Sequence, residues 1–292
     1  MSGAVVDAQI HTWVPESERY PWDHDVLRNI PPPLLDRFRQ LPLTAEDAID
    51  MMDEVGVTGA LLVSPTVYGL DHRYSFDAAE KYPGRFGVVG QIRPTALGAI
   101  EAAQQFGSMP NAVGIRVNIL PSMGIAVDDS RCLEVFRVAE REGTPVFLLA
   151  IDHVDDLHKI AAKFPSLTLV IDHLGLTTFD RHRDPWTPFP YLLGLAQYDN
   201  VFLKCSSVPS YSREAYPYRD LWPKLHRILE TFGPERIMWG TDYSQHRDEL
   251  TYQEALEYLR SSDEIGQTEK ALLLGGTLTA VTGWSPTSVS TS

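Results

Sequence analysis

The sequence predicts an α/β fold, a single (β/α)8 TIM barrel with a long lid-like loop after its first strand. Eight short apolar segments alternate with segments of helical character along the chain. Strands in such a series form a parallel sheet whose two faces are both covered. The 292 residues also fit the ~250 residues of one barrel with insertions. The alternative is an open, doubly wound sheet, but no glycine-rich phosphate loop follows any strand.

The chain opens with strand one and a long connection. An apolar run predicts the first strand within residues 4–13. Residues 14–42 then contain several aromatic residues, the run Pro31–Pro33 and no clear periodicity. A segment of this length inside a compact domain usually has a function, and we expect it to cover the same end of the barrel as a lid. Tyr20 and Trp22 are predicted to line a pocket there, although packing of the loop is the alternative role of Trp22.

The remaining strand–helix units follow in order. Thr44 can cap a helix that Gly56 ends, and Gly143 ends a later one. The predicted strands are residues 58–63, 86–92, 112–117, 146–151, 167–171, 201–204 and 237–239, and the predicted helices are residues 44–54, 71–82, 96–106, 130–142, 154–164, 188–197, 220–232, 252–261 and 267–274. No linker divides the chain, so we expect residues 1–284 to form one barrel domain and the polar residues 285–292 a loosely attached tail.

Composition limits the classes of function. The net charge is −14 and the sequence pI is about 5.0, which disfavours nucleic acid and anionic membranes as partners and suits an enzyme with a small-molecule substrate. The two cysteines, Cys132 and Cys205, have no metal-type spacing. No apolar run approaches ~20 residues, and no signal peptide opens the chain. We expect a cytoplasmic protein, and the sequence allows a homo-oligomer.

Polar side chains gather at the ends of three predicted strands. Asp7, Gln9 and His11 alternate along strand one and are expected to point the same way. His173 follows strand six, and Asp242 follows strand eight. In a parallel barrel this end of every strand faces the active site, so the imidazoles and the carboxylate should share one cavity. The competing interpretations are a core histidine at 173 and a helix cap at 242.

The middle strands supply cationic and amide groups. Arg93 ends strand three, and Arg116 ends strand four with Asn118 beside it. A guanidinium binds a carboxylate through two parallel hydrogen bonds, so Arg116 is predicted to bind an acidic substrate. The alternative is a salt bridge from Arg116 to an acid at a neighbouring strand end. The sequence leaves open whether Asp152 or His153, after strand five, reaches the site.

Three motifs resemble the amidohydrolase superfamily: Asp-Ala-Gln-Ile-His-Thr-Trp at 7–13, Val-Ile-Asp-His-Leu-Gly at 170–175 and Trp-Gly-Thr-Asp-Tyr-Ser at 239–244. The nearest branch is that of the amidohydrolase-related lactonases, which includes fuconolactonase-like and 2-pyrone-4,6-dicarboxylate lactonase-like enzymes. The resemblance implies a TIM barrel that opens a lactone or a related cyclic ester, with Asp242 activating water. It also implies that His11, His173 and Asp242 surround a divalent metal (zinc or manganese) or the scissile carbonyl.

One position departs from the family pattern. Strand one of the family usually carries His-x-His, and Gln9 replaces the first histidine here. Losing an imidazole weakens a metal site that draws three ligands from histidine and carboxylate, so a metal-independent site is the alternative, for which the pyrone dicarboxylate lactonases are the precedent. A metal-dependent, non-oxidative decarboxylase of an aromatic or unsaturated acid is the second functional hypothesis. A catalytically inactive barrel that serves as a binding protein is the third.

Overall fold

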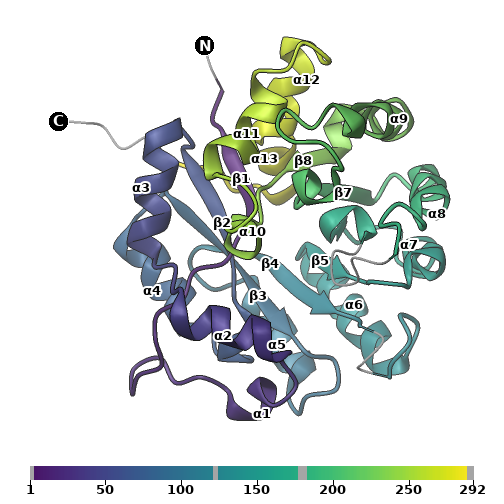
Figure 1. The fold of residues 1–292 in the computed structure, drawn as a ribbon. Helices are drawn as coiled ribbons and strands as arrows, with labels where there is room; N and C mark the ends of the chain where they lie inside the picture. The colour runs from purple at the N-terminus through teal and green to yellow at the C-terminus, as the bar shows by residue number, and fades with distance from the viewer. Residues whose placement is uncertain (1–2, 121–123, 177–182, 288–292) are drawn as a thin grey trace.

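Eight parallel strands curl into a barrel in the computed structural model (Figure 1), which describes residues 3–120, 124–176 and 183–287. The strands pair in sequence order, and β8 returns to β1 through the Asp242 N–H, which donates to the Gln9 carbonyl over 2.8 Å. The strands are β1 Val6–Ile10, β2 Gly59–Val63, β3 Phe86–Ile92, β4 Ala112–Asn118, β5 Val146–Leu149, β6 Leu169–Ile171, β7 Val201–Cys205 and β8 Ile237–Trp239. The predicted TIM barrel is confirmed.

Helices surround the sheet and cover its outer face (Figure 1). They are α1 His24–Leu27, α2 Pro32–Gln40, α3 Ala45–Val55, α4 Arg73–Lys81, α5 Ala99–Phe106, α6 Ser130–Glu142, α7 Leu157–Lys163, α8 Phe189–Gly194, α9 Trp222–Phe232, α10 Tyr243–His246, α11 Tyr252–Arg260, α12 Gln267–Ala271 and α13 Thr277–Thr282. Thr44 caps α3 in a capping box with Asp47, and Gly56 ends it at φ +77°, as the sequence predicts. No helix in the described ranges is long and apolar enough to cross a membrane.

Two hydrophobic layers hold the barrel together. Side chains such as Leu61, Phe147 and Met238 fill the inside of the barrel, and Trp284 packs below them. A larger layer lies between the strands and the surrounding helices. Beyond Trp284, the Thr287 N–H donates to the Gly84 carbonyl, so residues 285–287 follow the barrel floor; residues 288–292 of the predicted tail lie outside the described residues.

The connection after β1 is partly helical, which the sequence analysis did not predict. Helices α1 and α2 lie within residues 14–42, and Pro32 and Pro33 occupy the first turn of α2, where a proline has no N–H to lose. Arg37 on α2 contacts the Gln245 carbonyl. The connection is therefore fixed to the segment after β8.

The predicted direction of the Asp7 side chain is wrong. The register of β1 against β2 pairs Asp7 with Ala60 but Ile10 with Leu62, so β1 contains one extra residue. Such a bulge changes the face on which the following side chains lie. Asp7 consequently points away from Gln9 and accepts hydrogen bonds from Thr241 and Tyr252. Burial raises the pKa of Asp7 to about 6, against these hydrogen bonds, which lower it.

We predict that Asp7→Ala lowers the free energy of unfolding by about 3 kcal/mol, because it leaves several buried donors without an acceptor. These donors are the Thr241 N–H and hydroxyl, the Gln9 N–H and the Tyr252 hydroxyl. Urea denaturation of wild type and variant gives the difference. Asp7→Asn keeps one acceptor oxygen and should lose less. Equal stability of wild type and Asp7→Ala would contradict the structural role.

Candidate active site

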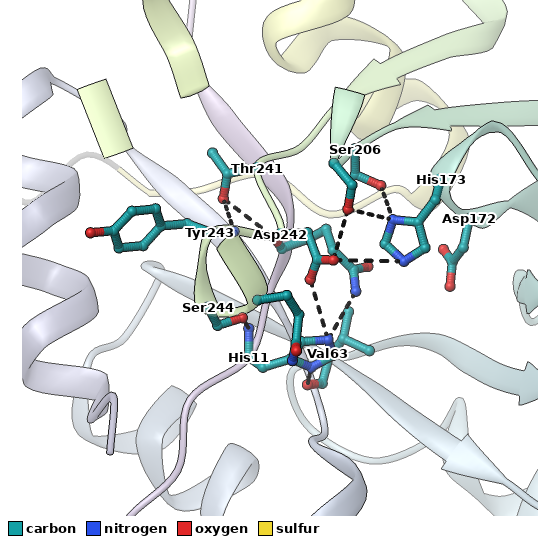
Figure 2. Close-up of polar contacts among 12 residues, drawn as sticks. His11, Val63, Asp172, His173, Ser206, Thr241, Asp242, Tyr243 and Ser244 are labelled. Carbon is teal, nitrogen blue, oxygen red and sulfur yellow. Dashed lines mark hydrogen bonds and ion pairs between the residues drawn. The ribbon is translucent and has the colours of Figure 1, made fainter. Parts of the chain in front are cut away.

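Asp242, His11 and His173 meet at the carboxyl ends of the strands (Figure 2). The His11 Nε2 atom lies 3.5 Å from Asp242 Oδ1, and the His173 Nε2 atom lies 4.0 Å from Asp242 Oδ2. All three side chains are buried. The convergence of strands one, six and eight that the sequence predicts is therefore present.

Unusual backbone conformations turn these side chains into the site. His173 and Asp242 have left-handed φ values of +53° and +52°, and Ser207 after β7 has +61°. Such values cost energy in residues with a Cβ and recur at functional sites. Although Asp242 precedes α10, its side chain makes no capping hydrogen bond. It accepts from the Ser207 hydroxyl over 2.8 Å instead, so the helix-cap interpretation does not describe its carboxylate.

Neighbouring groups hold the Nδ1 atom of each imidazole, on the side of the ring away from Asp242. The His11 Nδ1 atom lies 2.7 Å from the Val63 carbonyl, which only accepts, so Nδ1 carries a proton. The His173 Nδ1 atom lies 2.8 Å from the Ser206 hydroxyl. In both residues the Nε2 atom faces Asp242. A fixed ring with one nitrogen directed at a carboxylate suits a polar reaction centre.

The protonation states follow from burial and charge. Burial lowers the pKa of His173 to about 4, against the opposing charges of Asp242 and Asp172. Burial also lowers the pKa of His11. For Asp242, burial opposes ionisation, but His173 and His11 outweigh it and lower the pKa below its ordinary value. Near pH 7 the site therefore holds an ionised carboxylate beside imidazoles whose pKa values are lowered by burial.

One oxygen of this carboxylate has no hydrogen-bond partner in the described residues. Asp242 Oδ1 is buried and has no hydrogen-bond partner among the described residues, while Oδ2 is bound by Ser207. A buried ionised oxygen without a donor is costly, and such an atom is expected to receive a proton donor from a ligand or from water. Asp242 therefore has the charge and the open position of a general base.

A buried ion-pair network lies beside these residues. Asp172 accepts from the Arg116 Nε atom over 2.8 Å, and its second oxygen lies 2.8 Å from the Lys204 Nζ atom. Asp172 and Lys204 are fully buried. Burial opposes ionisation of Asp172, but the charges of Lys204 and Arg116 hold its pKa well below its ordinary value. The salt bridge that the sequence analysis gave as the alternative for Arg116 is present.

Sequence reasoning missed Lys204, Asp172 and His246, as well as Ser206 and Ser207, which contact His173 and Asp242. A lysine within the apolar strand 201–204 and an acid between Ile171 and His173 were the available signals. His246 follows Asp242 by one helical turn; its Nε2 atom lies 3.9 Å from Asp242 Oδ2, and its Nδ1 atom lies 3.2 Å from Glu249.

The other predicted site residues occupy varied positions. Asn118 is buried, and its Oδ1 atom has no partner in the described part of the chain. Arg93 is half-buried at the end of β3. The Tyr20 hydroxyl donates to Asp77, and the indole of buried Trp22 donates to the Val14 carbonyl.

Asp152 and His153, which follow strand five, form no hydrogen bond or ion pair with Asp242, His11 or His173 in the described residues. Asp152 is exposed and forms an ion pair with Arg183. His153 is half-buried, and its Nε2 atom is among the buried atoms without a partner in the described residues.

The donor set fits a divalent ion poorly. Within the described residues no group of three or more histidine, cysteine, aspartate or glutamate side chains is arranged to hold a metal ion. The Gln9 amide nitrogen lies 3.2 Å from His11 Nε2, the nitrogen that faces Asp242. The Lys204 ammonium lies 2.7 Å from the Gln9 side-chain oxygen. A fixed positive charge and an amide thus stand where the family pattern has an imidazole.

Comparisons with known proteins find a matching family and several relatives. A family profile described as amidohydrolase matches residues 6–277. The chain is 26% identical over 202 residues to 4-sulfomuconolactone hydrolase of Hydrogenophaga intermedia, covering 68% of this chain and 64% of that protein. It is 25% identical over 252 residues to L-fucono-1,5-lactonase of Burkholderia ambifaria, covering 83% and 81%.

A solved structure has the same fold. An amidohydrolase from Burkholderia multivorans with bound zinc superposes with a TM-score of 0.76 at 19% identity, covering 96% of this chain and 99% of that chain. At this identity the likeness establishes the fold alone. The chain spans just under two thirds of the length of the sulfomuconolactone hydrolase.

We predict that Asp172→Asn lowers the free energy of unfolding by about 3–5 kcal/mol, because two buried cations lose their shared counter-charge. Chemical denaturation followed by circular dichroism measures the loss. Asp199→Asn, which removes an exposed carboxylate before β7, is the matched control and should change stability by less than about 0.5 kcal/mol. Similar curves for the two variants would show that the network contributes little.

Proposed function

The chain belongs to the amidohydrolase family, and from this premise we propose that it is a hydrolase that opens a lactone or a related cyclic ester by attack of water. The observation that carries the proposal is the open Oδ1 atom of ionised Asp242, directed into a buried site between two imidazoles. The named relatives with lactone substrates support the same class of reaction.

Asp242 acts as the general base. A water molecule on its Oδ1 side gives up a proton to the carboxylate while the water oxygen attacks the lactone carbonyl carbon. The carbonyl oxygen then carries negative charge. When the ring C–O bond breaks, the protonated Asp242 returns the proton to the ring oxygen, which becomes the hydroxyl of the product. One water is consumed, and a hydroxy acid is formed.

His173 stabilises the charge that develops. Ser206 can donate its hydroxyl proton to His173 Nδ1, which places the ring proton on Nε2, the nitrogen directed at the site. A donor fixed in a buried site stabilises an oxyanion more than water does. His11 lies on the other side of the carboxylate, with its Nε2 atom 3.5 Å from Asp242 Oδ1. Catalysis is thus assigned to Asp242, His173 and His11.

Arg116 is the proposed contact for a substrate carboxylate. Its Nε atom is used by Asp172, and in the described residues its two Nη groups have no recorded hydrogen bond. These groups can donate two parallel hydrogen bonds to a carboxylate. Gln9 lies on β1, two residues before His11, and Asn118 lies on β4 with Arg116; both are proposed substrate contacts. Arg93, Tyr20 and Trp22 are proposed outer contacts. The substrate class is therefore a lactone that bears a carboxylate.

The alternatives have distinct signatures. A non-oxidative decarboxylase would consume a proton and release carbon dioxide, whereas lactone opening releases a proton once the product acid ionises. A binding protein would do neither. Zinc or manganese held by His11, His173 and Asp242 would polarise the carbonyl when bound, but the poor fit of the donor set favours the residues' own chemistry.

We predict that Asp242→Asn lowers kcat/KM by about 10²–10⁴-fold, the contribution of a positioned general base, while the fold is retained. A pH-indicator assay over a panel of five- and six-membered lactones, with and without a carboxylate, measures turnover, and circular dichroism checks the fold. Asp199→Asn should retain wild-type activity. Full activity of Asp242→Asn excludes it as the base, and a wild-type enzyme that opens no lactone of the panel contradicts the proposed function.

We predict that Arg116→Lys raises KM about 10-fold or more for carboxylate-bearing lactones and leaves KM for neutral lactones nearly unchanged. Lysine keeps a positive charge near Asp172 but loses the planar pair of donors, so uniform binding of the carboxylate is weakened. Arg93→Lys is the comparison variant: a smaller KM increase than that of Arg116→Lys assigns the carboxylate contact to Arg116. Equal KM increases for acidic and neutral lactones would contradict carboxylate binding by Arg116.

A further inference from the structure

Lys204 is a buried cation that the proposed reaction does not use. Its side chain has no exposed area, and its Nζ atom lies 2.8 Å from Asp172 Oδ1 and 2.7 Å from Gln9 Oε1. The same atom lies 4.3 Å from the centre of the Phe147 ring. The ammonium therefore sits inside the barrel beneath the carboxylate and the imidazoles, bound to strands one and six.

This ammonium fixes the direction of the Gln9 amide. An ammonium has donors only, so the amide oxygen of Gln9 must face Lys204. The amide nitrogen then faces His11 Nε2 at 3.2 Å. Because His11 Nδ1 donates its proton to the Val63 carbonyl, Nε2 is the acceptor of the Gln9 N–H. One directed chain of hydrogen bonds thus runs from Lys204 through Gln9 and His11 to Val63.

This chain of hydrogen bonds occupies the nitrogen atom that a metal ion would need. A divalent ion binds the lone pair of a neutral imidazole nitrogen, and here the lone pair of His11 Nε2 is already held by Gln9. The Lys204 ammonium adds a fixed positive charge one side chain away, which repels a second cation. At position 9 the family pattern, as the sequence motifs suggest, has an imidazole instead.

We propose that Lys204 and Gln9 form a positioning pair that replaces a divalent ion in this site: together they supply positive charge and keep the His11 lone pair from binding metal. Lys204 touches no reacting atom in this proposal. It acts through Gln9 on His11 and through Asp172 on Arg116. The pair is a property of the folded chain and holds whichever substrate the enzyme takes.

Metal binding of paired variants tests the proposal. Wild type, Gln9→His, Lys204→Met and Gln9→His/Lys204→Met are freed of metal with a chelator and titrated with Zn²⁺ and with Mn²⁺ by calorimetry, and metal content is measured after dialysis. We expect well under one equivalent in wild type. Gln9→His alone should gain little, because Lys204 still donates to the new imidazole. The double variant should bind one equivalent, about 10–100-fold more tightly than either single variant.

Matched controls separate the pair from general effects. Gln91→His adds an imidazole on β3, and Lys270→Met removes a buried lysine bonded to the Ser262 carbonyl; neither should change metal affinity. One tightly held equivalent of zinc in wild type, or a folded double variant with no gain in affinity, would overturn the proposal.

A measurement on wild type keeps the test decisive if the double variant does not fold. Nitrogen-15 NMR of the histidine side chains should find the His11 proton on Nδ1, with a spectrum that added Zn²⁺ leaves unchanged. A proton on Nε2, or a shift of the Nε2 signal with one equivalent of Zn²⁺, would refute it. None of these readouts needs turnover, so failure of the lactone assay and failure of this proposal are distinguishable.

Discussion

The geometry of the whole site depends on one buried carboxylate. Asp172 joins three strands, because it follows β6 and binds Arg116 of β4 and Lys204 of β7. The register explains the meeting: Ile171 pairs with Leu203, so the next residues of the two strands face one another inside the barrel. Burying two cations is tolerable only with such a counter-charge. The network therefore fixes the Arg116 side of the site relative to the Asp242 side.

The orientation of Asp242 and His173 depends on the backbone conformation just after the strands. His173, Ser207 and Asp242, which lie two or three residues after β6, β7 and β8, each have a Cβ and adopt left-handed conformations. Each turn directs a polar side chain inward just beyond the apolar strand. Because Ser207 contacts both His173 and Asp242, the backbone strain at the three turns serves one hydrogen-bonded group.

Much of this could be predicted from the sequence. The order of short apolar strands and helices indicated the barrel, and placing Asp242, His11 and His173 at strand ends was enough to predict their meeting, because parallel strands share one active end. Asp7 could not be placed correctly, since the extra residue in β1 appears only in the pairing with β2.

Other features needed the register and the local turns. Lys204 looks like the charged end of a strand until its pairing shows that it lies inside the barrel. Within residues 14–42, α1 has only four residues, and α2 begins in the run Pro31–Pro33, which is typical of a loop. For Lys204 the short-range pattern was correct about the strand and silent about its neighbours, whereas for residues 14–42 it missed the helices themselves.

The central claim is that substrate binds between the cationic side, at Arg116, and the open oxygen of Asp242. A crystal structure of the protein soaked with a carboxylate-bearing hydroxy acid, the product type, tests it most directly. We expect the ligand's own carboxylate on the Nη groups of Arg116 and its newly formed carboxyl within hydrogen-bond distance of Asp242 Oδ1. A ligand bound elsewhere, with both positions filled only by ordered water, would contradict it.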